Sequence, residues 1–174
     1  MNEIIALVVI VVICITALLL QAYWHQKKSR LQEALLVQSE LIKERQNFTL
    51  PHKMEAYQRA ILYLERMNPT SLVLRLSDPT ISATAMQVVL LKALRDEYDH
   101  NVAQQLFISE SSWTLLKTAK EETARLISVV SEQLPEGSTS VDLCSSLITK
   151  TAEVKPLPSE IAIEALKAEF QRLM

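Results

Sequence analysis

The sequence predicts an all-α protein with an N-terminal transmembrane helix, a juxtamembrane helix and a small bundle of about five or six short helices. Three observations carry this prediction. The first 24 residues are almost entirely apolar, later apolar residues recur at helical spacing, and no two segments read as strands that could pair. We divide the chain into 1–24 (transmembrane anchor), 25–50 (juxtamembrane helix), 51–135 (helical core domain) and 136–174 (C-terminal helices).

The composition excludes several classes of function. The chain carries 18 Lys and Arg against 20 Asp and Glu, for a net charge of -2, and aromatic residues make up 5%. These values are not typical of a nucleic-acid-binding surface, so we expect no nucleic-acid partner. The single glycine, Gly137, excludes a glycine-rich phosphate loop. Two cysteines, Cys14 and Cys144, are too few for a disulfide framework or a zinc cluster.

Residues 1–24 predict a membrane-spanning helix. Between Ile4 and Leu20 only Thr16 is not apolar, and extension to Trp24 gives about 21 residues, which as a helix cross a bilayer core. A cleavable signal peptide is one alternative, but the segment has neither a basic start nor an A-x-A cleavage site. A buried core helix is another, and it would be shorter with a polar face.

The flanks of this segment predict its orientation. Lys27, Lys28 and Arg30 follow the span, whereas Glu3 is the charged side chain that precedes it. The positive-inside rule then places the N-terminus outside and the C-terminal domain in the cytoplasm. For a bacterium this is a single-pass protein of the inner membrane, with the lipid bilayer as one partner.

The juxtamembrane segment predicts a helix that can self-associate. Its apolar residues are Leu31, Leu35, Leu41, Ile42 and Phe48. They give a modest heptad pattern that Gln38 interrupts. We expect Leu31, Leu35 and Ile42 to be interaction residues, and we expect Pro51 to end the helix.

The core domain begins with two predicted helices. Met54, Tyr57, Ile61 and Leu64 form one apolar face of the first, and Glu55 and Arg59 form an exposed pair four residues apart. Asn68 is the expected N-cap of the second, which starts at Pro69 and ends at Leu76.

Further capping motifs predict the remaining helices. Thr84 with Gln87 resembles a capping box for a helix that reaches about Phe107. Ser109 is expected to cap a helix to Leu134, Thr139 with Asp142 to open the next, and Ser159 to cap the last.

Several short motifs lie between Ala56 and Lys120. They are Ala56-Tyr57-Gln58-Arg59, Leu64-Glu65-Arg66-Met67-Asn68-Pro69, Glu97-Tyr98-Asp99-His100-Asn101, Gln104-Gln105-Leu106-Phe107, Trp113 and the pair Lys117 and Lys120. In these motifs the sequence resembles an uncharacterised family of single-span helical proteins, found mainly in Bacteroidota and classed as a domain of unknown function. The resemblance implies a membrane-anchored helical architecture and brings no activity.

Glu97 and His100 are the candidate metal ligands. Three residues apart on a helix, a carboxylate and an imidazole face the same way, as they do in di-iron carboxylate bundles. Such sites need a second Glu-x-x-His motif, which the sequence lacks. The structural alternative is that His100 and Asn101 tie their helix to a neighbour by hydrogen bonds.

Arg59, Arg66 and Arg75 are candidates for a polar network with Glu65. Structural ion pairs are one interpretation, and an anion or phosphate pocket is the functional one. Arg59, Arg66 and Trp113 also count as interaction candidates, although a tryptophan at this helical spacing is typical of a core.

These residues contain no complete catalytic set, so we expect no enzyme and no cofactor. The predicted function is a membrane-anchored, non-catalytic helical module with a cytoplasmic surface for protein interaction or self-assembly, its partner being another protein or a second copy. The alternative is a membrane-tethered helical bundle that binds a metal or an anion.

Overall fold

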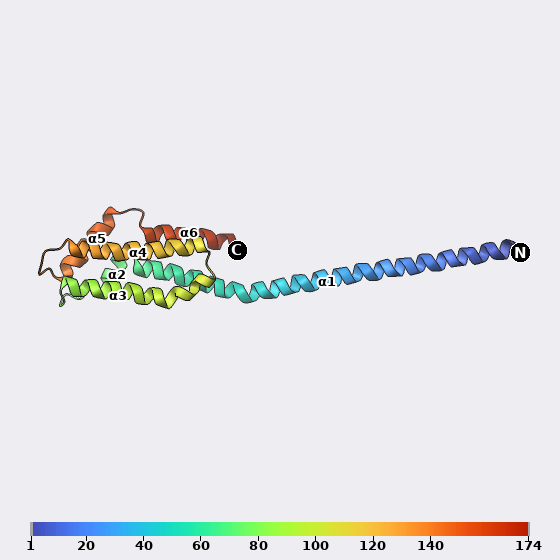
Figure 1. Ribbon diagram of the computed structural model, residues 1–174, viewed down its shortest axis with the longest axis horizontal. Helices are drawn as coiled ribbons and strands as arrows, with labels where there is room; N and C mark the ends of the chain where they lie inside the picture. Colours follow the sequence, from blue (N-terminus) through green and yellow to red (C-terminus); the bar gives the residue numbers. More distant parts are fainter. Residues whose placement is uncertain (1, 174) are drawn as a thin grey trace. The chain divides into compact units, whose positions relative to one another are not determined.

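The computed structural model describes the backbone of residues 2–173, and side chains throughout except at 2–14, 17, 19, 22 and 29–35. Its elements are α1 (Asn2–Met67), α2 (Pro69–Leu76), α3 (Ala83–Asn101), the 3-10 helix η1 (Val102–Leu106), α4 (Glu110–Glu132), α5 (Ser140–Glu153) and α6 (Pro158–Leu173) (Figure 1). The described residues contain no strand, which confirms the all-α class.

The chain divides into two compact units, residues 1–49 and residues 50–174. The first unit consists of the N-terminal part of α1, and the second holds the rest of α1 and every later helix.

The structure does not support the transmembrane helix expected at 1–24. Across the part of the chain that it describes, no helix combines the length and the apolarity that crossing a bilayer requires. The side chains of residues 2–14, over half of that segment, lie outside the described residues.

The helix end expected at Pro51 is wrong. Helix α1 continues through Pro51 to Met67. A proline inside a helix lacks the N–H that would bond to the carbonyl four residues earlier, here that of Asn47. The side chain of Pro51 is exposed, so water can reach the backbone groups around it. The next sixteen residues also form a helix whose buried face packs in the second unit, and this packing outweighs the local cost.

The buried face of α1 in the second unit is Ala56, Tyr57, Ala60, Tyr63, Leu64 and Met67. The predicted face contained Tyr57 and Leu64, but Met54 is exposed and Ile61 is only partly buried. The difference arises because Ala56 and Ala60 are small, so the neighbouring helices approach on their side and cover the large Tyr63 ring.

Helix α2 begins as predicted, and α3 does not. The Asn68 side chain accepts a hydrogen bond from the Thr70 backbone N–H at 3.1 Å, with Pro69 in the first turn. For α3 the N-cap is Ser82 rather than Thr84, because the Ser82 hydroxyl accepts from the N–H of Ala85. The α-helix then ends at Asn101 and a 3-10 turn carries the chain to Leu106.

The caps of α4 and α5 are confirmed. Ser109 accepts from the Ser112 N–H, and Thr139 and Asp142 form both bonds of a capping box. Ser159 is not the cap of α6, which starts one residue earlier at Pro158. There the Glu160 carboxylate accepts from the Leu157 N–H, so the acidic residue of the first turn supplies the cap.

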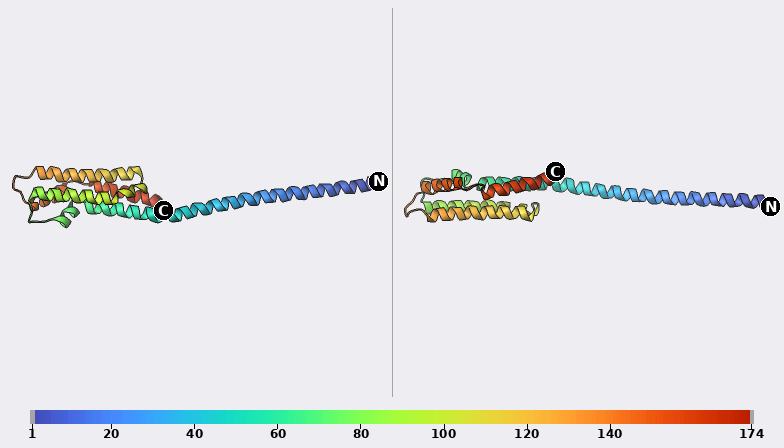
Figure 2. Two further views of the ribbon diagram at one scale, coloured as in Figure 1. Left: turned by 60° about the horizontal axis from the view of Figure 1, so that its bottom comes forward. Right: turned by 90° about the horizontal axis from the view of Figure 1, so that it is seen from above.

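Within the second unit the helices form two layers. The right-hand view of Figure 2 shows α3 and α4 as one layer, with α5, α6 and the C-terminal part of α1 as the other. Between them lies one apolar core, whose fully buried large residues are Tyr63, Leu64, Leu72, Met86, Leu90, Leu116, Ile127, Leu143, Leu147 and Leu166. Every helix of this unit from α1 to α6 contributes to that core, so the unit folds around it as one body.

Two loops at one end of the unit are joined by backbone hydrogen bonds. The N–H of Ala83 donates to the Ser138 carbonyl at 3.0 Å, and the N–H of Ser140 donates to the Ile81 carbonyl at 3.1 Å. Gly137 precedes this junction with φ of 84°, a backbone conformation that favours glycine.

The continuity of α1 predicts that Pro51→Ala stabilises the protein. Alanine restores the missing N–H at an exposed position where proline costs up to about 3 kcal/mol in a helix interior. We expect increased helicity by circular dichroism and slower amide exchange at residues 47–50. Pro79→Ala, in the exposed turn before α3, is the matched control and leaves both measurements unchanged. Faster exchange at 47–50 in Pro51→Ala would contradict a continuous helix.

Candidate functional site

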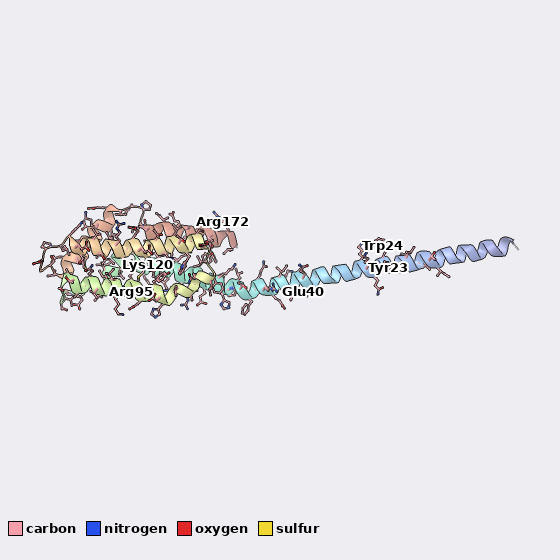
Figure 3. All side chains as sticks on the ribbon, in the orientation of Figure 1. Tyr23, Trp24, Glu40, Arg95, Lys120 and Arg172 are labelled. Carbon is pink, nitrogen blue, oxygen red and sulfur yellow. The ribbon has the colours of Figure 1, made fainter. Side chains whose placement is uncertain are left out.

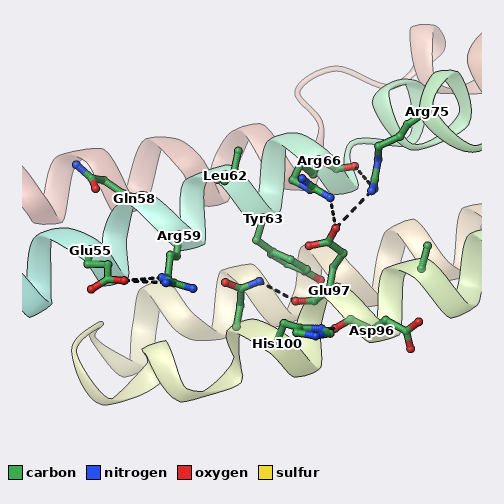
Figure 4. Close-up of a pocket in the computed structure, with 12 residues that line it drawn as sticks. Glu55, Gln58, Arg59, Leu62, Tyr63, Arg66, Arg75, Asp96, Glu97 and His100 are labelled. Atoms are coloured by element: carbon green, nitrogen blue, oxygen red, sulfur yellow. Dashed lines mark hydrogen bonds and ion pairs between the residues drawn. The ribbon is translucent and has the colours of Figure 1, made fainter.

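A groove of the second unit lies between α1, α2 and α3 and has a volume of about 730 Å³ (Figure 4). Its polar walls come from Glu55, Gln58, Arg59, Arg66, Arg75, Asp96, Glu97, His100 and Asn101, and its other lining residues are Leu62, Tyr63 and Ala93. The fold therefore brings together the arginines and the Glu97–His100 motif that the sequence singled out separately.

Glu97 joins three helices at one end of this groove. Its Oε1 accepts from Arg66 in the last turn of α1 and from Arg75 Nη1 in the last turn of α2, the latter at 3.3 Å. Arg75 also donates through Nη2 to the Arg66 carbonyl at 3.5 Å. These side chains are partly buried: that of Arg66 is 43% exposed and that of Glu97 is 24% exposed. Charges in such a setting interact more strongly than fully solvated ones.

Glu65, the expected partner of these arginines, does not belong to the polar node that Arg66, Arg75 and Glu97 form. Glu65 is exposed on α1 and does not line the groove. Arg59 forms the predicted pair with Glu55 instead, with Arg59 Nη2 and Glu55 Oε1 2.8 Å apart, on an exposed surface.

His100 and Asn101 do not tie α3 to a neighbouring helix. The Asn101 amide donates to the Glu97 carbonyl at 2.8 Å, and His100 Nδ1 lies at hydrogen-bond distance from the Asp96 carbonyl, both within the same helix. Because a carbonyl only accepts, Nδ1 is the donor in this contact. Among the described residues no cluster of three His, Cys, Asp or Glu side chains could hold a metal ion.

Tyr63 forms part of the groove wall and is 1% exposed. Figure 4 shows its ring reaching from α1 towards Glu97 on α3. Within residues 2–173 no acceptor lies at hydrogen-bond distance from its hydroxyl. Burial, together with nearby acidic groups, raises the pKa of Tyr63 above its ordinary value, so the hydroxyl keeps its proton. A buried donor without an acceptor is costly and uncommon in native proteins.

A row of aromatic rings continues from Tyr63 into the second layer. Tyr98 lies 6.2 Å from Tyr63 and 6.0 Å from Trp113 between ring centroids, and the Lys120 ammonium lies 4.1 Å from the Tyr98 centroid. Trp113 is buried and its indole nitrogen has no partner among the described residues. Trp113 therefore contributes to the core and offers no surface to a partner.

Sequence reasoning missed a second polar node, centred on Glu169 of α6. Its Oε1 accepts from the Tyr57 hydroxyl at 2.6 Å and from the Ser109 N–H at 3.0 Å, and its Oε2 accepts from the Ser109 hydroxyl at 2.7 Å. The carboxylate thus sits at the N-terminus of α4, where a negative charge is stabilising. A polar Ser109 before α4 was the visible sequence feature, but its partner is 60 residues away.

The pKa of Glu169 reflects two opposing effects. Burial raises it, whereas hydrogen bonds from Ser112, Tyr57 and Ser109 lower it by more, so the net pKa lies below the ordinary value. The same contact keeps the Tyr57 proton in place, since burial and the Glu169 carboxylate both raise the pKa of that hydroxyl.

The interaction candidates on the first unit are only partly described. Ile42 is 51% exposed, and the side chains of Leu31 and Leu35 lie outside the described residues. Further towards the N-terminus of α1, the Lys27 ammonium lies 5.9 Å from the Trp24 ring centroid, and Figure 3 shows Tyr23 and Trp24 there.

The Glu169 node predicts a pH-dependent stability. Because its folded pKa is depressed, the carboxylate stabilises the fold above its ordinary value of 4.5, and this contribution is lost as the pH falls through the folded pKa. We expect Glu169→Gln to lower the free energy of unfolding by about 1 kcal/mol at pH 7, and by less below pH 4.5. Urea unfolding measures both. The exposed Glu164→Gln is the control. A constant difference between wild type and Glu169→Gln from pH 7 to pH 3 would contradict this account.

Comparison with known proteins gives a family and no activity. No curated protein and no solved structure matches the chain. A family model described as "Family of unknown function (DUF7935)" matches residues 2–173, nearly the whole sequence. The chain therefore belongs to this family of unknown function, DUF7935.

Proposed function

We propose that the protein is a non-catalytic, membrane-anchored helical module that self-assembles through residues 36–48 of α1. The observation that carries this proposal is the exposure of large apolar side chains there. Leu36, Val37, Leu41 and Ile42 are each more than half exposed in the first unit. Several large apolar side chains exposed within one short stretch of helix favour an interaction surface.

The spacing and the charges of this segment favour a second copy as the partner. Leu35 and Ile42 are seven residues apart, as in a heptad seam, and Val37 and Leu41 form an i,i+4 pair on a different face of the helix. Glu40, Lys43, Glu44 and Arg45 place both signs of charge beside these apolar residues. A parallel pair of identical helices can match such mixed charges while it covers the apolar face.

The proposed anchor is the apolar sequence from Ile4 to Leu20. Backbone groups of such a segment are all satisfied within a helix in lipid, and Tyr23 and Trp24 suit the headgroup region. Lys27, Lys28 and Arg30 favour a cytoplasmic position for the second unit. Tethering to one bilayer would hold the copies parallel and raise their effective concentration. A weak contact between residues 36–48 of two copies would then be enough for self-assembly.

Self-assembly predicts a mass change on substitution. Full-length protein in a mild non-ionic detergent should have the mass of two or more chains by light scattering, corrected for detergent. The double variant Leu41→Gln/Ile42→Gln should shift to one chain, because it removes apolar area from the seam. Leu74→Gln, at a comparably exposed leucine on α2, is the matched control and should retain the wild-type mass. A monomeric wild type, or a double variant with unchanged mass, would refute self-assembly through this segment.

The anchor predicts behaviour in a flotation assay with phosphatidylcholine vesicles. Full-length protein should float with the vesicles and resist extraction by alkaline carbonate. Val12→Asp/Ile15→Asp should remain in the dense fractions, because each charge within the apolar run costs about 3 kcal/mol in the bilayer core. Asn2→Asp, outside the run, should float like the wild type. Carbonate-resistant flotation of the double Asp variant would refute this anchor.

A further inference from the structure

We propose that the groove between α1, α2 and α3 is a binding site for a phosphomonoester group, held by Arg66 and Arg75. This inference is independent of self-assembly, because it rests on residues of the second unit alone.

Arg66 and Arg75 have N–H donors that no acceptor in the described part of the chain uses. A guanidinium group has five N–H donors in a planar fork. Arg66 Nη2 and Arg75 Nη1 both donate to Oε1 of Glu97, and Arg75 Nη2 donates to the Arg66 carbonyl. Most of the N–H donors of the two guanidinium groups therefore have no protein acceptor within residues 2–173. Arg66, Arg75 and Glu97 together carry a single net positive charge. Of the other charged residues that line the groove, Arg59 is paired with Glu55, and Asp96 is paired with Lys92. An incoming anion can add to this node without displacing Glu97.

The buried hydroxyl of Tyr63, a residue that lines the same groove, lacks an acceptor within residues 2–173. It is fully buried and protonated, and the described residues offer it no acceptor. A ligand oxygen seated beside Glu97 would supply one, since the Tyr63 ring reaches towards Glu97 (Figure 4). A purely structural ion-pair node gives no reason to keep a costly unsatisfied hydroxyl at this place.

The geometry favours a phosphate over a carboxylate. Arg66 and Arg75 come from different helices, and Tyr63 lies in the wall between α1 and α3. A carboxylate is planar and pairs best with one fork, whereas a phosphomonoester presents three oxygens in three directions. His100 lines the groove as well.

The size of the groove allows the phosphate to carry an organic group. A volume of about 730 Å³ lies within the range of small-molecule sites. The same chemistry could come from a soluble phosphomonoester or from the headgroup of a lipid such as phosphatidic acid, so the test has one arm for each source.

The soluble arm is titration calorimetry of the full-length protein with glycerol 3-phosphate, with glycerol as the ligand control. We expect saturable binding of glycerol 3-phosphate alone. Arg66→Gln and Arg75→Gln should each weaken it at least tenfold, whereas Glu97→Gln should tighten it several-fold by removing the competing negative charge. Arg95→Gln, an exposed arginine of α3 outside the groove (Figure 3), is the matched control and should bind like the wild type.

The lipid arm measures the melting temperature of the same proteins in detergent micelles doped with phosphatidic acid or with phosphatidylglycerol, a phosphodiester. Stabilisation by phosphatidic acid alone, lost in Arg66→Gln, would support the site and identify a headgroup as its ligand. Binding in the soluble arm alone would support the site and identify a free phosphomonoester.

Tyr63→Phe separates a ligand site from a structural node. Without ligand this variant should melt at a higher temperature than the wild type, because it removes an unsatisfied buried hydroxyl, and it should bind the phosphomonoester more weakly. This variant also decides the matter if Glu97→Gln fails to fold. The proposal would be overturned if neither arm showed a response to its ligand. It would also be overturned if Arg66→Gln and Arg95→Gln had equal effects on binding.

Discussion

Burial of one face of α1 is the constraint on which the second unit depends. Ala56 and Ala60 allow the other helices to approach closely, and Tyr63, Leu64 and Met67 then fill the space between the two layers. The two polar clusters around Glu169 and Glu97 lie beside this face, because Tyr57 of α1 bonds to Glu169 and Arg66 of α1 bonds to Glu97. The register of α1 in the core therefore sets the geometry of the groove and of the cap on α4.

The two polar nodes serve different ends. Glu169 is saturated by hydrogen bonds from Tyr57 and Ser109, so it stabilises the fold and has little capacity for a ligand. Glu97 is shared between two arginines that keep most of their donors, and Tyr63 beside it has a hydroxyl without an acceptor. Because hydrogen-bonding groups around Glu97 lack partners among the described residues and those around Glu169 do not, we expect a ligand at Glu97 and a contribution to stability at Glu169.

Local features of the fold were predictable, and distant pairings were not. The caps at Asn68, Ser109 and Thr139 depend on bonds to residues two or three positions away, so the sequence displays them directly. The helix through Pro51 depends on packing that no local rule contains. The partner of Arg66 was expected next to it in sequence, yet it lies 31 residues away on α3. Sequence spacing singled out Arg59, Arg66, Arg75, Glu97 and His100 but not the pairing of Arg66 and Arg75 with Glu97, and it missed Tyr63 and Asp96.

Helix α1 buries apolar residues within its own unit from Ala56 to Met67, and self-assembly would bury those at residues 36–48 against a second copy. Amide hydrogen exchange of the full-length protein at increasing concentration distinguishes these two modes of burial. We expect strong, concentration-independent protection at 56–67, and protection at 36–48 that grows with concentration. Fast exchange at 56–67, or exchange at 36–48 that does not change with concentration, would contradict this expectation.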